Sequence, residues 1–149
     1  MVLGADHGGF ELKERVKVFL RQRGYQVSDY GCYSNDSVDY PDIACLVAEA
    51  VSTGTDTVGV MIDTIGIASA MVANKVPGVR AACCWNIFTA KSSREHNNAN
   101  FLTLGGGVMG LALAQEIVQA WLQTEFTGGR HERRVDKIID VERRYSKGR

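Results

Sequence analysis

Two short polar segments that follow predicted strands contain side chains able to move protons or bind anions. Asp6 and His7 precede a pair of glycines, and Asp63 begins a turn that continues through Thr64 and Gly66. Glycine lets the backbone approach a ligand, and the start of the helix that follows favours an anion. Each segment also has a simpler interpretation, because Asp6 and Asp63 suit helix N-caps and His7 suits a solvated loop.

His96 is the best acid–base candidate in the chain, because an imidazole changes its charge near neutral pH. It lies within residues 93–100 together with three asparagines, one of which, Asn97, follows it directly. This concentration of polar side chains suits a catalytic group. Helix termination and turn chemistry explain it equally simply.

A pair of arginines near the C-terminus suits a phosphate. Arg130 and Arg134 are four residues apart and share one face at the start of a predicted helix. Two guanidiniums at that end repel each other and the helix dipole, and an anion between them would relieve the repulsion. The alternative is a solvated basic face paired with Glu132 and Asp136.

Short β-rich segments alternate with helical patterns along the whole chain, which predicts an α/β fold with a parallel sheet between helices. The predicted strands are residues 2–5, 25–29, 57–62, 79–84 and 101–104. The predicted helices are residues 10–24, 41–51, 67–75 and 86–96, one opened by the glycines at 105–107, and residues 130–145. Ligands bind where the strands of such sheets end, and Asp6 and Asp63 come directly after strands.

The last predicted helix has an apolar stripe beside its basic face. The stripe consists of Val135, Ile138, Ile139 and Tyr145. Such a helix can dock on a second subunit or on its own domain, and the pattern alone favours neither.

Length and composition limit the class of protein. The 149 residues suit one domain spanning residues 1–149. Lys+Arg and Asp+Glu both number 17, so no overall field attracts nucleic acid or a membrane surface. No apolar run is long enough to cross a membrane and no secretion signal is visible, so we expect a cytoplasmic protein. Cys32, Cys45, Cys83 and Cys84 match no zinc spacing, and we expect reduced thiols.

Five segments, taken together, resemble ribose-5-phosphate isomerase type B. They are Asp6-His7-Gly8-Gly9-Phe10, Ser37-Val38-Asp39-Tyr40-Pro41-Asp42, Ala73-Asn74-Lys75-Val76-Pro77-Gly78-Val79-Arg80-Ala81-Ala82, Ser93-Arg94-Glu95-His96-Asn97 and Gly128-Gly129-Arg130-His131. The resemblance covers nearly the whole chain in order and spacing. It extends to the A and B subunits of galactose-6-phosphate isomerase, which belong to the same family.

The resemblance implies a Rossmann-like three-layer fold with a five-stranded parallel sheet, and a homodimer or tetramer whose active sites are shared between subunits. It implies aldose–ketose isomerisation of ribose 5-phosphate, or of a related sugar phosphate, without a metal or organic cofactor. By analogy His96 opens the sugar ring. The substrate-binding residues would be Asp6, His7, Thr64, Gly66, Asn97 and, from the partner chain, Arg130 and Arg134 on the phosphate.

One turn departs from the family's pattern. The family usually has Cys-Gly-Thr-Gly-x-Gly after the third strand, with the Cys as proton-shuttling base and the turn as anion hole. This chain has Asp63-Thr64-Ile65-Gly66-Ile67-Ala68. Ser69 stands where another branch has a Glu, and Gly107 where a further phosphate-binding Arg is expected. Asp63 is therefore the predicted base, with a simple helix cap as the alternative.

The Asp-containing turn leaves three hypotheses open. The chain is an isomerase by itself, with His96 and Asp63 as catalytic residues. Alternatively, it is one subunit of a hetero-oligomer, because the turn is more similar to that of the A subunit of galactose-6-phosphate isomerase, whose B subunit carries the cysteine. A third possibility is a relative that binds sugar phosphates without chemistry.

Overall fold

Five short strands form one parallel sheet. In the computed structural model, which describes residues 1–54 and 57–146, they are β1 (Val2–Ala5), β2 (Ser28–Asp29), β3 (Gly59–Asp63), β4 (Ala81–Cys83) and β5 (Phe101–Gly105). Their order across the sheet is β2-β1-β3-β5-β4. The three inner strands β1, β3 and β5 are buried along their whole length, as expected for a parallel sheet covered on both faces. The predicted α/β class is confirmed.

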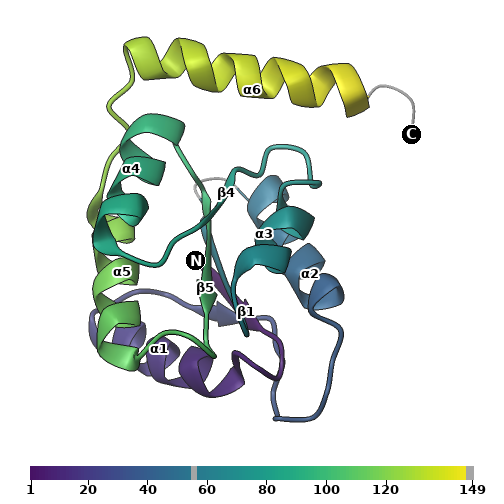
Figure 1. Cartoon of the computed structure of the whole chain (residues 1–149), viewed down its shortest axis with the longest axis vertical. Coiled ribbons are helices and arrows are strands. Elements are labelled where there is room, and N and C mark those ends of the chain that lie inside the picture. The colour runs from purple at the N-terminus through teal and green to yellow at the C-terminus, as the bar shows by residue number, and fades with distance from the viewer. Residues whose placement is uncertain (55–56, 147–149) are drawn as a thin grey trace.

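Helices cover both faces of the sheet (Figure 1). They are α1 (Phe10–Gln22), α2 (Tyr40–Thr53), α3 (Ile67–Ala73), α4 (Ile87–Asn97), α5 (Leu111–Gln123) and α6 (Arg130–Ser146). The core has two halves, because successive strand residues face opposite sides. Leu3 and Ile62 pack with α1, α4 and α5, whereas Val2 and Met61 pack with α2 and α3. The predicted apolar faces of α1 and α5 lie in the first half.

Helix α6 lies outside these three layers and spans the top of the molecule in Figure 1. It packs on α4 near its start, and Val135 is its one buried residue. Farther along, Glu142 accepts a hydrogen bond from the amide of Gly78 at 2.9 Å. Of the other stripe residues, Ile139 is half-buried, whereas Ile138 and Tyr145 are exposed to solvent in this chain. No described helix is long and apolar enough to cross a membrane.

Several predicted boundaries were wrong. β2 lacks residues 25–27, because the amide of Tyr25 closes the end of α1 on the carbonyl of Leu20 at 3.1 Å. β4 lacks Val79, whose amide completes the turn after α3. The glycines at 105–107 do not open α5, which begins at Leu111.

Lys13 ties α1 to the segment after β2. Its fully buried ammonium donates to both oxygens of Asp29 at 2.8 and 3.0 Å and to the carbonyl of Cys32 at 2.6 Å. Although burial opposes ionisation, Lys13 and Lys17 hold the pKa of Asp29 below its usual value. The amide of Cys32 in turn donates to the carbonyl of Ala5 at 2.6 Å. Lys13 thus fixes the backbone beside the end of β1.

The substitution Lys13→Ala should lower the free energy of unfolding by about 3–5 kcal/mol, because it removes a fully buried partner of the largely covered Asp29 carboxylate. Urea denaturation followed by circular dichroism measures this change. Lys17→Ala is the matched control. Lys17 lies nearer to solvent and leaves the Lys13–Asp29 pair intact, so its loss should cost about 1 kcal/mol or less. Equal losses in the two variants would contradict the role assigned to Lys13.

Candidate active site

Two carboxyl groups meet at the edge where the strands end. Ala5 pairs with Ile62 in the register of β1 and β3, so the next residues, Asp6 and Asp63, leave the sheet side by side. Both side chains are buried, and both line a cavity of about 420 Å³. The other walls of this cavity are Tyr40, Thr64, Ile65, Ile67, Ala68 and Met71.

The carboxylate of Asp63 is bound by its own turn. Its Oδ1 accepts hydrogen bonds from the amides of Ile65, at 2.8 Å, and Gly66. Its Oδ2 accepts from the amide of Ser69 at 3.1 Å and from the Ser69 hydroxyl at 2.5 Å. Asp63 therefore caps the start of α3. Its predicted role as the base stays a prediction.

The carboxyl group of Asp6 has far fewer partners. Oδ1 accepts a hydrogen bond from the amide of Gly9 at 3.0 Å. Burial raises the pKa of Asp6 above its usual value, although the Gly9 amide stabilises the charged form, and the negative charge of Asp63 raises it further. Asp6 is thus a carboxyl group of raised pKa that faces a cavity.

His7 follows Asp6 and is exposed. Its Nδ1 accepts a hydrogen bond from the amide of Val38 at 3.3 Å. In the neutral ring this places the proton on Nε2, which can then donate a hydrogen bond to an oxygen of a ligand.

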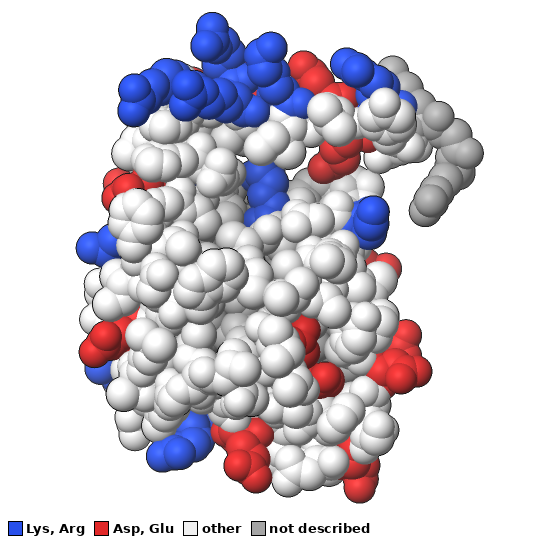
Figure 2. Space-filling view, viewed as in Figure 1, with Lys and Arg blue, Asp and Glu red and all other residues white. Residues whose placement is uncertain are grey.

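The other predicted site residues gather at the opposite edge of the sheet. His96 and Asn97 close α4, and Arg80, just before β4 begins, donates from Nε to the carbonyl of Asn98 at 3.0 Å. The end of α4 is therefore at the edge where the strands start. Arg130 begins α6 here, and Figure 2 shows Lys and Arg side chains crowded over this helix, above a hollow in the surface.

A second imidazole, which the sequence did not single out, lies against His96. The rings of His96 and His131 stack with centroids 4.3 Å apart and planes inclined by 12°. Nε of Arg130 donates to Nε2 of His131 at 3.4 Å. Loss of solvent contact and the neighbouring His96, Arg130 and Arg134 lower the pKa of His131. The imidazole cluster is therefore surrounded by positive charge, as an anion site requires.

The comparisons with known proteins decide the family. A model of the Ribose/Galactose Isomerase family matches residues 1–138. The chain belongs to this family. Ribose-5-phosphate isomerase B of Escherichia coli (strain K12) is 42% identical over 144 residues, 97% of each chain. The structure of Clostridium thermocellum ribose-5-phosphate isomerase B is 52% identical, with a TM-score of 0.94 over 97% of each chain.

A third relative carries a ligand. The structure of ribose-5-phosphate isomerase B from Mycoplasma genitalium, with bound ribulose-5-phosphate, is 39% identical, with a TM-score of 0.91 over 95% of each chain. The predicted family, the Rossmann-like fold and the class of activity, sugar-phosphate isomerisation, are confirmed by these relatives.

Two departures from the family's pattern are neighbours in space. A Cβ added to Gly107 would lie 2.9 Å from Cγ2 of Thr64, and one added to Gly8 would overlap Oγ1 of Thr64. The side chain of Thr64 therefore fills the space between Gly8 and Gly107. The arginine that the resemblance leads us to expect at position 107 would therefore require the side chain of Thr64 to move.

The four thiols are poorly suited to act as a base. All are free, and burial raises the pKa of each one above its usual value. Cys83 is the one near the turn, since its Sγ is 3.2 Å from where a Cβ of Gly66 would lie. A raised pKa keeps a thiol protonated, and the thiolate is the reactive form.

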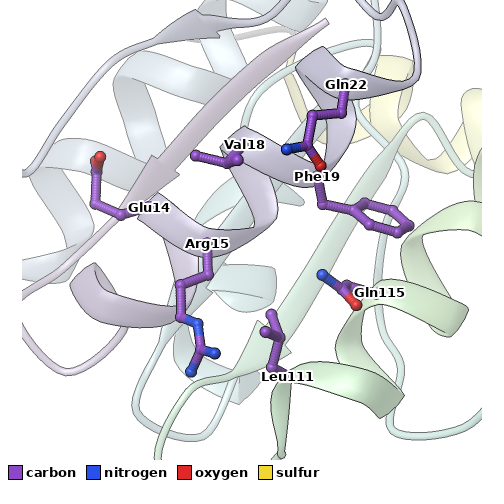
Figure 3. Close-up of a pocket in the computed structure, with 7 residues that line it drawn as sticks. All are labelled: Glu14, Arg15, Val18, Phe19, Gln22, Leu111 and Gln115. Atoms are coloured by element: carbon purple, nitrogen blue, oxygen red, sulfur yellow. The ribbon is translucent and has the colours of Figure 1, made fainter.

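Two further observations concern other kinds of site. In residues 1–54 and 57–146, no group of three or more His, Cys, Asp or Glu side chains could hold a metal ion. A cavity of about 380 Å³ lies between α1 and α5 and contains none of the predicted site residues (Figure 3). Its lining residues are Glu14, Arg15, Val18, Phe19, Gln22, Leu111 and Gln115.

The glycine before α1 is a steric requirement of this site. A Cβ on Gly9 would overlap the carbonyl oxygen of Ile62, whereas nothing lies within 4 Å of a Cβ on Gly110. Gly9→Ala should therefore lower the free energy of unfolding by about 1–3 kcal/mol or more and displace Asp6. Gly110→Ala should change it by about 0.5 kcal/mol at most. Thermal unfolding of both variants measures the difference, and equal midpoints would contradict the close approach.

Proposed function

We propose that this chain interconverts ribose 5-phosphate and ribulose 5-phosphate, and that each active site is built from two copies of the chain. The relatives named as ribose-5-phosphate isomerase B and the bound ribulose-5-phosphate in one of them support the substrate. The cytoplasmic location stays a prediction from the sequence.

One observation carries the proposal of a shared site. The carboxyl groups lie where the strands end, whereas His96, Arg130 and Arg134 lie where the strands begin. A single sugar phosphate cannot reach both edges of one sheet. A second copy that brings its His96 and its arginines to the cavity of the first would complete the site, and two-fold symmetry would complete both sites at once.

Exposed apolar side chains support such an assembly. Ile67 and Met71, at the cavity, are 50% and 63% exposed, and Ile138, Val141 and Tyr145 on α6 are 46%, 52% and 78% exposed. Apolar surfaces of this kind mark interaction sites. We propose that α6 packs on the partner subunit.

Different residues suit different steps of the proposed reaction. Arg130 and Arg134 would hold the phosphate in charge-assisted hydrogen bonds. His96 would open the ring by taking the proton of the ring hydroxyl and returning one to the ring oxygen. His7 and Asn97 would then hold oxygens of the open chain.

A proton then moves from C2 to C1, the carbonyl carbon of the open-chain aldose. Asp6 and Asp63 are the candidate bases at the cavity. The intermediate enediolate needs hydrogen-bond donors. Thr64 and Gly66, which are predicted to contact the substrate, lie in the turn beside both carboxyl groups.

A second candidate function rests on the turn itself. The carboxylate of Asp63 occupies the amides of Ile65, Gly66 and Ser69, which would otherwise be free to bind an enediolate oxygen. This occupation suits a subunit of a hetero-oligomer, or a sugar-phosphate-binding relative without chemistry. Either alternative predicts that the purified chain binds ribose 5-phosphate without exchanging its hydrogens with solvent.

The shared site is tested by mixing two inactive variants. The wild-type chain should convert ribose 5-phosphate to ribulose 5-phosphate, and Asp6→Asn and His96→Ala should each lose most of this activity. Co-expression of the two should restore about one quarter of the wild-type rate, because half of randomly formed dimers are mixed and each mixed dimer has one intact site.

The control pairs two variants on the same side of the site. In the proposed assembly, one subunit supplies both His96 and Arg134 to a given site. When His96→Ala is co-expressed with Arg134→Ala, every site therefore lacks one of the two groups, and no recovery is expected. Recovery in this control, or none in the first mixture, would contradict the shared site. An inactive wild-type chain would favour the second candidate function.

The position of α6 gives a separate prediction. Ile138→Asp places a charge in the apolar stripe and should dissociate the dimer at micromolar concentration, because a buried unpaired charge is costly. Arg143→Asp, about 140° around α6 from Ile138, is the control and should leave the dimer intact. Sedimentation velocity distinguishes these outcomes, and a monomeric wild-type chain would contradict the assembly.

A further inference from the structure

We infer that Asp6 is the group that carries the proton between the two sugar carbons, and that Asp63 acts as a fixed anion that positions the turn. This inference rests on the proposed isomerase function and assigns its base. It differs from the prediction made from the sequence, in which Asp63 takes that role.

The hydrogen bonds of the two carboxyl groups carry the argument. An ionised carboxylate offers about four lone-pair sites. Asp63 receives four donors, two on each oxygen, from Ile65, Gly66 and Ser69. To accept a proton from a substrate, it would have to give up at least one of these bonds inside a buried turn. Asp6 has fewer donors: the amide of Gly9 donates to its Oδ1 at 3.0 Å, and the amide of Gly8 contributes more weakly.

Both groups reach the same cavity, so position does not separate them. Asp6 and Asp63 leave adjacent strands at the same level of the sheet, and both line the cavity beside Tyr40. What separates them is the freedom of an oxygen to take up a proton. Only Asp6 has one.

Other groups near the cavity suit the role less well. The thiols of Cys32 and Cys83 have raised pKa values because they are buried, so they hold their protons. Nδ1 of His7 is occupied by the amide of Val38, and its Nε2 then carries the proton as a donor. His7 is therefore suited to polarise the carbonyl oxygen rather than to remove a proton from carbon.

The charges around Asp6 favour a base that works near neutral pH. The groups that face it are Asp63 from the end of β3, His7 from its own loop, Cys32 from the segment after β2, and Tyr40 from α2. Burial and Asp63 raise the pKa of Asp6, whereas His7 acts in the opposite direction. A base is more effective when its pKa approaches the working pH.

The step balances without any further reactant. The hydrogen on C2 leaves as a proton to Oδ2 of Asp6, its electron pair forms the C1–C2 double bond, and the carbonyl π pair moves to O1. Asp6 then returns the proton to C1, while the proton of the C2 hydroxyl moves to O1 and the C2 carbonyl forms. The carboxyl group ends in its starting state.

The test uses the purified full-length chain with ribose 5-phosphate in deuterium oxide, followed by proton NMR. Asp6→Asn should lose exchange of the C2 hydrogen by about a hundredfold or more, and calorimetry should show that it still binds ribulose 5-phosphate. Asp63→Asn should lose less than about tenfold. As the pH falls, the exchange rate of Asp63→Asn should begin to decrease at a lower pH than that of the wild type, because removal of the negative charge at position 63 lowers the pKa of Asp6.

Chemical rescue provides a measurement that does not depend on the folding of the Asp63 variant. Formate should restore exchange to Asp6→Ala in proportion to its concentration, because a small carboxylate can occupy the vacated space. Exchange that survives in Asp6→Asn but vanishes in Asp63→Asn, or an absence of rescue by formate, would overturn the inference. A wild-type chain that shows no exchange would overturn the proposed function itself. This result differs from the results in the variants that would overturn only the assignment of the base.

Discussion

The site depends on one register of two strands. Because Ala5 lies opposite Ile62, the next residues, Asp6 after β1 and Asp63 at the end of β3, place two buried carboxyl groups side by side. Two buried negative charges side by side are unfavourable unless the surroundings stabilise the charge of one group more than that of the other. The hydrogen bonds of the two groups differ in this way. The turn supplies four donors to Asp63, while Asp6 has fewer donors, the amides of Gly9 and Gly8, and a raised pKa. Pairs of titratable groups separated in this way are typical of acid–base sites.

The backbone around these two groups has little room for change. The amides of Gly106 and Gly107 donate to the carbonyls of Asp63 and Thr64 at 2.7 and 2.9 Å, so the loop after β5 supports the turn after β3. Thr64 fills the space between two glycines. Substitutions at positions 64 and 107 are therefore coupled by contact.

The sequence predicted the fold and the edge of the sheet, because both follow from local patterns. Alternation of β-rich and helical segments indicates a parallel sheet, and residues directly after strands lie at its carboxyl edge. That is how Asp6 and Asp63 were found. Boundaries were wrong where distant groups decide them, as at Tyr25, whose amide bonds back to α1. The stacking of His131 on His96 was missed, because it needs the start of α6 to meet the end of α4.

The contact between the start of α6 and the end of α4 has a local cause that the periodicity of the sequence does not reveal. Thr127 donates from its amide and its hydroxyl to the carbonyl of Glu95, at 3.2 and 2.7 Å, and so fastens the segment before α6 to the end of α4. The imidazoles and arginines are thereby held together at one edge, and the carboxyl groups at the other. Within the described residues of one copy, neither edge contains both the arginines proposed to bind phosphate and a carboxyl group proposed as the base. The sheet keeps these two groups of residues apart, which is why the proposed site needs a second copy of the chain.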